Sequence, residues 1–329
     1  MFRHAVRFVS PLALTVALAS VPVAALAQGV PRTSWGHPDL QGTWSTATIT
    51  PFERPAELAG KEFFTREEAA AFERQTLERE NRDRRDGTAE ADLARAYNDF
   101  WWDRGTRTVP TRRTSLVVDP PDGRVPALTP EAQQRLAAAA AARKQRGPAD
   151  HPEDRNLWER CITRGLPNVL LPQPYNNNFE IIQTTDHVVI LAEMIHDARI
   201  IPIDGRPHLP QTIRQWLGDS VGKWEGDTLV VETTNFTNKT SYRGAGESLR
   251  LVERFTRTAP GILTYRVTID DPTTFTRPWT VELPAIPSDG PIYEYACHEA
   301  NYGLEGILRG HRAEEQRAAT TAGKKSQQQ

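Results

Sequence analysis

The sequence lacks several motifs that would identify a common enzyme class. It contains no glycine-rich phosphate loop and no glycine pattern of the kind that binds a dinucleotide. No two cysteines occur at CxxC spacing, and the histidines follow no recognised zinc pattern. We therefore predict a protein without a cofactor or a metal ion, and we do not predict serine-based hydrolysis.

Charge and hydropathy argue against two further classes. The formal net charge is −2 and no basic stripe runs along the chain, which argues against a nucleic-acid partner. After residue 27, no stretch reaches the roughly 20 consecutive apolar residues that span a bilayer as a helix. The remaining chain is long enough to bury a sizeable core as one large domain.

The N-terminus has the pattern of a secretory signal peptide over residues 1–27. A basic start that includes Arg3 and Arg7 precedes a mostly apolar run over 8–24. Ala25 and Ala27 then supply the small residues of a cleavage site. A membrane anchor is the alternative. We favour cleavage and predict a periplasmic or secreted bacterial protein.

The two cysteines, Cys161 and Cys297, predict one disulfide in such an oxidising compartment. The bond would close a long loop and could stabilise the fold by roughly 4–5 kcal/mol in the chain-entropy model. It would also bring Arg164 close to His298 and Glu299. Two buried thiols are the alternative.

Residues 28–155 are expected to form an extended arm and a partly helical lead-in. The first part is rich in Pro, Gly and Thr, which favours extended chain. Capping patterns and an Ala-rich run predict two helices. The expected elements are a short strand within 42–50, a helix from the capping box at Thr65 and Glu68 to about residue 84, a strand over 114–119 and a helix from Pro130 to Lys144.

From residue 156 the pattern changes to short β-strands separated by turn residues. Apolar and polar residues alternate clearly over 249–255 and 263–269, as in a sheet with one buried face. About eight such segments predict a mainly β fold over 156–312, an antiparallel up-and-down barrel of the lipocalin type. A two-sheet sandwich is the alternative. We also expect a closing strand over 292–299, a short helix near 211–217 and a disordered tail over 313–329.

Two stretches, 175–204 and 292–302, place many ionisable side chains on segments that resemble buried strands. We expect the two stretches to meet and form a site. A histidine would act as a general acid or base, and a carboxylate would orient it. The candidate catalytic residues are His187, Glu193, His196, Asp197, His298 and Glu299.

Arginine and aromatic side chains are the candidates for substrate binding. An arginine would hold an anionic group or a developing oxyanion, and the dense aromatic residues of 97–107 would line a pocket or cover the core. A tyrosine could donate a proton. The candidates are Arg164, Tyr175, Arg199, Trp101, Trp102, Tyr295 and Tyr302.

Simpler interpretations remain open for the same residues. They could be satisfied surface and turn groups, with one turn at Asp186 and His187 and another over 195–197. A metal site built from His187, Glu193, His196 and His298 is a further alternative, but the spacing fits no zinc pattern.

The amino-acid sequences of several segments resemble an uncharacterised family of secreted bacterial proteins, over most of the chain after the signal peptide. The resemblance implies no activity and transfers no catalytic residue. The spacing of strands and turns after residue 156 also resembles lipocalin-type barrels, which implies a cavity for a small, partly apolar ligand. The segments that carry the family resemblance are 113–124, 159–167, 186–208, 222–236, 277–284 and 293–299.

Three functions follow as hypotheses. The first is an exported, cofactor-independent enzyme, a hydrolase, lyase or isomerase that uses histidine and carboxylate acid–base chemistry on a small organic, partly apolar or aromatic substrate. The second is a periplasmic barrel that binds a small molecule without turnover. The third is a structural protein of the cell envelope that makes contacts through residues 28–60.

Overall fold

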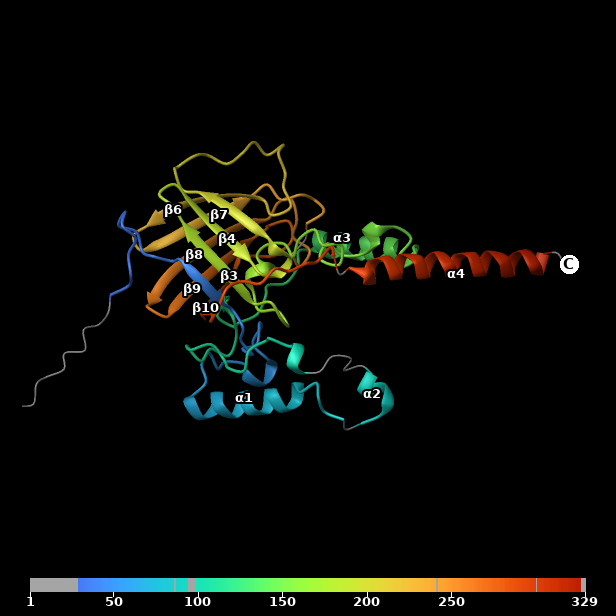
Figure 1. The fold of residues 1–329 in the computed structure, drawn as a ribbon, viewed down its shortest axis with the longest axis horizontal. Helices are drawn as coiled ribbons and strands as arrows, with labels where there is room; N and C mark the ends of the chain where they lie inside the picture. Colours follow the sequence, from blue (N-terminus) through green and yellow to red (C-terminus); the bar gives the residue numbers. More distant parts are fainter. Residues whose placement is uncertain (1–28, 86, 94–98, 241, 300, 327–329) are drawn as a thin grey trace, which may run out of the picture.

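The computed structural model describes residues 29–326 except 86, 94–98, 241 and 300. The predicted signal peptide therefore lies outside the described residues. The fold is mainly β, with a nearly closed, antiparallel, barrel-like sheet (Figure 1). The strands are β1 (Gly42–Ser45), β2 (Val117–Asp119), β3 (Asn178–Gln183), β4 (His187–Ala192), β5 (Ala198–Pro202), β6 (Asp219–Glu225), β7 (Thr228–Thr234), β8 (Arg250–Ala259), β9 (Ile262–Asp270) and β10 (Trp279–Pro287).

The order of strands around the sheet explains why it is nearly closed. Nine strands follow the path β5-β4-β3-β1-β10-β9-β8-β7-β6, and β2 pairs with β10 beside this path. Strands β5 and β6, at the two ends of the path, lie next to each other, but no hydrogen-bonded register joins them in the described part of the chain. The predicted barrel is thus confirmed, with an open seam between β5 and β6.

Successive side chains of a strand point to opposite faces of the sheet, so every second side chain lies inside the barrel. In β8, Leu251 and Phe255 are fully buried, and in β9, Ile269 and Tyr265 are buried opposite them. Burying one large apolar side chain contributes roughly 1.5–3 kcal/mol. These side chains join Trp44 and residues of the other strands in one continuous core.

The described residues form four α-helices, all outside the sheet: α1 (Arg66–Glu80), α2 (Ala89–Leu93), α3 (Pro130–Lys144) and α4 (Tyr302–Ser326). The predicted capping box is present at the start of α1, where the Glu68 amide donates to Thr65 Oγ1. Helices α1 and α2 lie to one side of the barrel, whereas α4 projects away from it (Figure 1). None of the described helices is long and apolar enough to cross a membrane.

Short 3-10 turns connect several of these elements. They are η1 (Ala56–Leu58), η2 (Asp99–Trp101), η3 (Pro152–Asp154), η4 (Asn168–Leu170) and η5 (Met194–His196).

The predicted disulfide is confirmed. Cys161 and Cys297 are bonded, with their Cα atoms 5.7 Å apart and a sequence separation of 136 positions. The bond fixes the segment after β10 against the segment before η4. A disulfide of this kind fits an extracellular or periplasmic protein.

Three local predictions differ from the structure. Residues 292–299 form no strand, because β10 is already paired on both sides, by β9 and by β1. Residues 211–217 form turns between Pro210 and Gly218 instead of a helix. The tail expected to be disordered from residue 313 continues α4 as far as Ser326.

Candidate functional site

The central stretch is broken by a tight turn, so the candidate residues on it do not share one strand face. Strand β4 ends at Ala192, and β5 begins at Ala198. Between them, Ile195 and His196 both have positive φ, 59° and 44°. The structure thus has the alternative arrangement, a turn over 195–197, which places Glu193 and Asp197 in buried positions and leaves His196 exposed.

Asp197 is the most strongly anchored carboxylate of this turn. Its Oδ2 accepts hydrogen bonds from Thr163 Oγ1 at 2.8 Å and from the Arg164 amide at 3.0 Å. Burial raises the pKa of the Asp197 carboxyl, and these two hydrogen bonds offset part of that effect. Asp197 therefore fixes the backbone from which the Arg164 side chain projects.

Arg164 is a half-buried cation with a neutral hydrogen-bond partner. Its Nε donates to Gln173 Oε1 at 3.1 Å, and its Nη2 donates to the same oxygen. The guanidinium lies over the ring of Trp158, 4.9 Å from the ring centroid. Desolvation lowers the pKa of Arg164, and no carboxylate lies within ion-pair distance of it among the described residues.

Arg164 belongs to the wall of a pocket of about 530 Å³, which we call the basic pocket. Of the charged side chains in its wall, five are cationic and only Glu153 is anionic. Among the cations, Lys239 pairs with Glu153 at 2.8 Å and Arg155 pairs with Glu159 at 2.8 Å. The cationic residues are Arg143, Arg155, Arg160, Arg164 and Lys239.

The disulfide and two hydrogen bonds bring the second predicted stretch against this region. His196 Nδ1 lies 2.9 Å from the Tyr295 carbonyl oxygen, and Asn301 Nδ2 donates to the Glu159 carbonyl at 2.7 Å. The stretches 175–204 and 292–302 therefore contact each other, as expected. His298 and Glu299 are nevertheless exposed, and neither forms an ion pair within the described part of the chain.

His187 lies at the opposite end of β4 from this turn. It closes the β3–β4 hairpin, where its amide donates to Thr184 Oγ1 at 2.9 Å and its Nδ1 lies 3.1 Å from Asp186 Oδ1. The structure therefore does not assemble His187, His196 and His298 around one point. Among the described residues, the alternative metal site of these three histidines with Glu193 is not assembled either.

Arg199 points into the barrel instead of toward the basic pocket. Its guanidinium makes two contacts with the Glu253 carboxylate, at 3.0 and 2.6 Å. The Tyr265 hydroxyl donates to the same carboxylate at 2.9 Å, and Arg199 also donates to Ser220 Oγ at 3.1 Å. Burial raises the pKa of the Tyr265 hydroxyl well above its usual value, and the Glu253 charge adds to this effect.

Ser220 lies in Gly218–Gly222, a segment with the G-x-S-x-G spacing of a nucleophile elbow. Such an elbow requires a sharp turn from a strand into a helix. Ser220 instead lies within β6, and its Oγ contacts Thr233 Oγ1 at 2.9 Å and Arg199. The segment therefore gives no support to serine-based hydrolysis.

The other candidate substrate-binding residues fall outside the wall of the basic pocket. Trp101 is exposed in η2, and Trp102 packs under the guanidinium of Arg82. Tyr302 is exposed at the start of α4, and Tyr175 is exposed in the loop before β3. Tyr175 and Tyr295 are close enough to Arg164 to raise its pKa slightly against desolvation.

Glu193 has a carboxylate neighbour that the sequence did not suggest. Its Oε2 accepts a hydrogen bond from Asn178 Nδ2 at 2.8 Å. Desolvation raises the pKa of Asp103, and the negative charge of Glu193 raises it further. Neither carboxylate lines the basic pocket.

Sequence reasoning missed most of the cations that surround Arg164. They come from the end of α3, from the connector after it and from the loop after β7, so they are far apart in the sequence. The available signal was the density of arginine over 143–164, which includes Arg155 and Arg160 beside Trp158.

Comparison with known proteins adds no identity to this site. No protein-family model, no curated protein and no solved structure matches the chain significantly.

Proposed function

We propose that this protein binds a small organic anion in the basic pocket. The observation that supports this proposal best is Arg164, a half-buried guanidinium whose hydrogen-bond partner is the neutral Gln173. A cation in this position lowers its free energy when a carboxylate or phosphate approaches. The ligand would supply the negative charge that no carboxylate among the described residues places within ion-pair distance of Arg164.

The remainder of the pocket supports the same ligand class. Arg143 and Arg160 form no ion pair within 4 Å among the described residues, so the pocket carries an excess of positive charge that attracts anions. Its volume of about 530 Å³ fits a small organic molecule. Leu157 and Trp158 add apolar wall for the uncharged part of such a molecule.

Binding without turnover is favoured over an acid–base enzyme by the positions of the histidines. His187 lies at the far end of β4, and His196 contacts a backbone carbonyl. Neither His196 nor His298 lines the basic pocket. An export compartment remains part of the proposal, supported by the disulfide and by the signal-peptide pattern.

The experiment is a titration with benzoate, with the neutral amide benzamide as the matched ligand control. We expect benzoate to bind one-to-one and Arg164→Gln to weaken it at least about tenfold, because a hydrogen bond to a charged group is worth roughly 1.5–3 kcal/mol. Arg277→Gln removes an exposed arginine that pairs with Asp119 on the barrel and should leave the affinity unchanged.

Native mass spectrometry on protein purified from its own host would extend the test to the natural ligand. An intact anion at one-to-one stoichiometry would support the proposal. Equal affinity for benzoate and benzamide, or an unchanged affinity in Arg164→Gln, would contradict it. A bound fragment with a cleaved or rearranged bond would favour the enzyme instead.

A further inference from the structure

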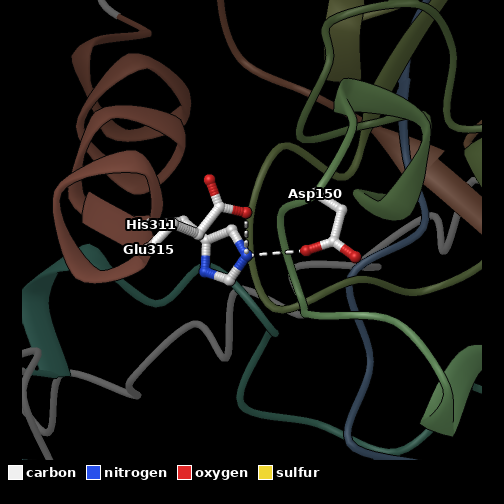
Figure 2. A group of neighbouring side chains, drawn as sticks. All are labelled: Asp150, His311 and Glu315. Carbon is white, nitrogen blue, oxygen red and sulfur yellow. Dashed lines mark hydrogen bonds and ion pairs between the residues drawn. The ribbon is translucent and has the colours of Figure 1, made fainter. Parts of the chain in front are cut away.

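A second site lies where α4 meets the connector after α3. Asp150, His311 and Glu315 bring three donor atoms together, all within 4.8 Å of one another (Figure 2). His311 Nε2 lies 2.7 Å from Asp150 Oδ1 and 3.5 Å from Glu315 Oε1. The three residues converge on one point, although Asp150 is 161 positions away from His311 in the sequence.

The helix presents two of these donors from one face. His311 and Glu315 are four residues apart on α4, so their side chains lie one above the other. The imidazole nitrogen approaches both carboxylates directly (Figure 2). One imidazole nitrogen and two carboxylate oxygens form a donor set that suits zinc and related divalent transition metals.

The connector is shaped around the same group. The Gly147 amide donates to Asp150 Oδ2 at 2.8 Å, which leaves Oδ1 directed at His311. A Cβ atom on Gly147 would lie 2.3 Å from Asp150 Oδ1 and 2.6 Å from His311 Nε2. Only glycine therefore leaves the space beside the two donor atoms open, and its amide orients the carboxylate as metal-site neighbours do.

One cationic side chain, Arg312, lies beside the donors and joins the helix to the connector. Arg312 Nη1 donates to both carboxylate oxygens of Glu315, at 3.1 Å to Oε1 and 2.8 Å to Oε2, and its Nη2 donates to the Asp150 carbonyl at 2.7 Å. It thus fixes α4 on the connector while Glu315 Oε1 faces His311.

We propose that Asp150, His311 and Glu315 bind a divalent transition-metal ion, with zinc as the best match to the donor set. Water would complete the coordination. Tetrahedral bonds of about 2.0–2.1 Å place neighbouring donor atoms roughly 3.3 Å apart, so the Asp150 and His311 donors need to separate only slightly. The metal replaces the proton shared between them.

The location of the site gives it a structural role. It joins α4 to the connector, and the same connector supplies Glu153 and Arg155 to the wall of the basic pocket. A bound ion would hold this wall and the projecting helix together. The inference does not depend on the proposed anion binding.

The test is a titration of the untagged, chelator-treated full chain with zinc chloride, followed by elemental analysis of the dialysed protein. We expect one zinc per chain, and we expect proton release that makes the binding heat depend on the buffer. Both cysteines are in the disulfide, so no thiol competes for the ion. His311→Ala and Glu315→Gln should each weaken binding at least about tenfold.

His298→Ala is the matched control, because it removes an exposed histidine close to α4 that belongs to no ion pair among the described residues. Circular dichroism would establish that α4 stays helical in each variant. Unchanged affinity in helical His311→Ala or Glu315→Gln, or less than one zinc per chain in the wild type, would overturn the proposal. Arg164→Gln should bind zinc normally, which separates this result from the test of anion binding.

Discussion

Arg199 and Arg164 are two arginines that the sequence predicts to bind substrate, and the structure places them in different environments. Arg199 is buried inside the barrel, where Glu253 neutralises it completely and Tyr265 completes the network. Arg164 is half-buried outside the barrel, and Gln173 gives it a hydrogen bond but no counter-charge. A neutralised cation serves the fold, whereas one without a counter-charge remains available to a ligand.

The strongest test of this comparison is to remove the counter-charge from Arg199. In Glu253→Gln the buried guanidinium loses its anion, and we expect the free energy of unfolding to fall by about 3–5 kcal/mol. Urea denaturation at neutral pH would measure the change. A loss below about 1 kcal/mol would show that Arg199 tolerates burial without its partner, and the comparison would fail.

The double variant with Arg199→Leu and Glu253→Leu is the control. Replacing a whole buried ion pair by apolar side chains is often nearly neutral. We therefore expect the double variant to recover most of the stability that Glu253→Gln loses. Benzoate affinity should be unchanged in the double variant, because neither residue lines the basic pocket.

A smaller effect is expected at Asp197, the carboxylate that anchors the Arg164 backbone. Burial raises its pKa, so the folded state holds this proton more tightly than the unfolded state does. The contribution of Asp197 to the free energy of unfolding is therefore most favourable below the pKa of Asp in the unfolded chain, near 4. It declines as the pH rises through the pKa of Asp197 in the folded protein.

Asp197→Asn keeps an oxygen that can accept from Thr163 and from the Arg164 amide, but it removes the buried charge. We expect a gain of less than about 1 kcal/mol at pH 7 and no gain near pH 3. Urea unfolding of both proteins over this pH range measures the difference, and Asp103, whose pKa is also raised, is common to both. A stability difference that does not vary with pH would contradict a raised pKa of Asp197 in the folded protein.

The smallest effect is expected at His187, which lies in the hairpin away from both arginines. Its ring contacts Asp186, an exposed carboxylate whose pKa is lowered mainly by this hydrogen bond. His187→Ala should change the free energy of unfolding by about 0.5 kcal/mol or less. It should leave benzoate binding unchanged in calorimetry, and a clear loss of binding would return His187 to the functional site.

The fold could be predicted to a large extent because local patterns and the global architecture agree. Alternation in β8 and β9 predicted buried faces, and the capping box at Thr65 predicted the start of α1. The disulfide followed from two cysteines and an export signal. Where a partner decided the outcome, prediction failed. Residues 292–299 have strand character, but no free sheet edge next to β10 can receive them.

The candidate site was less accessible to sequence reasoning. Ionisable residues on apparent strands drew attention to Arg199 and Asp197, but the sequence does not show which side of the barrel each one faces. Ile195 and His196 have positive φ in the turn that brings Asp197 to Thr163, and no local sequence pattern predicts this conformation. Arg160 and Lys239 are far apart in the sequence and line the same pocket only in the folded protein, so no local spacing predicts their proximity.

The disulfide also changes the topology of the polypeptide as a covalent object. Cys161 and Cys297 turn the chain between them into a closed ring of residues, and this ring contains β3 through β10. A protease that cuts one peptide bond in the exposed loop over 205–216 would open the ring without dividing the molecule. All ten strands would remain in one covalent piece, so the loop can be cut while the barrel keeps every strand attached.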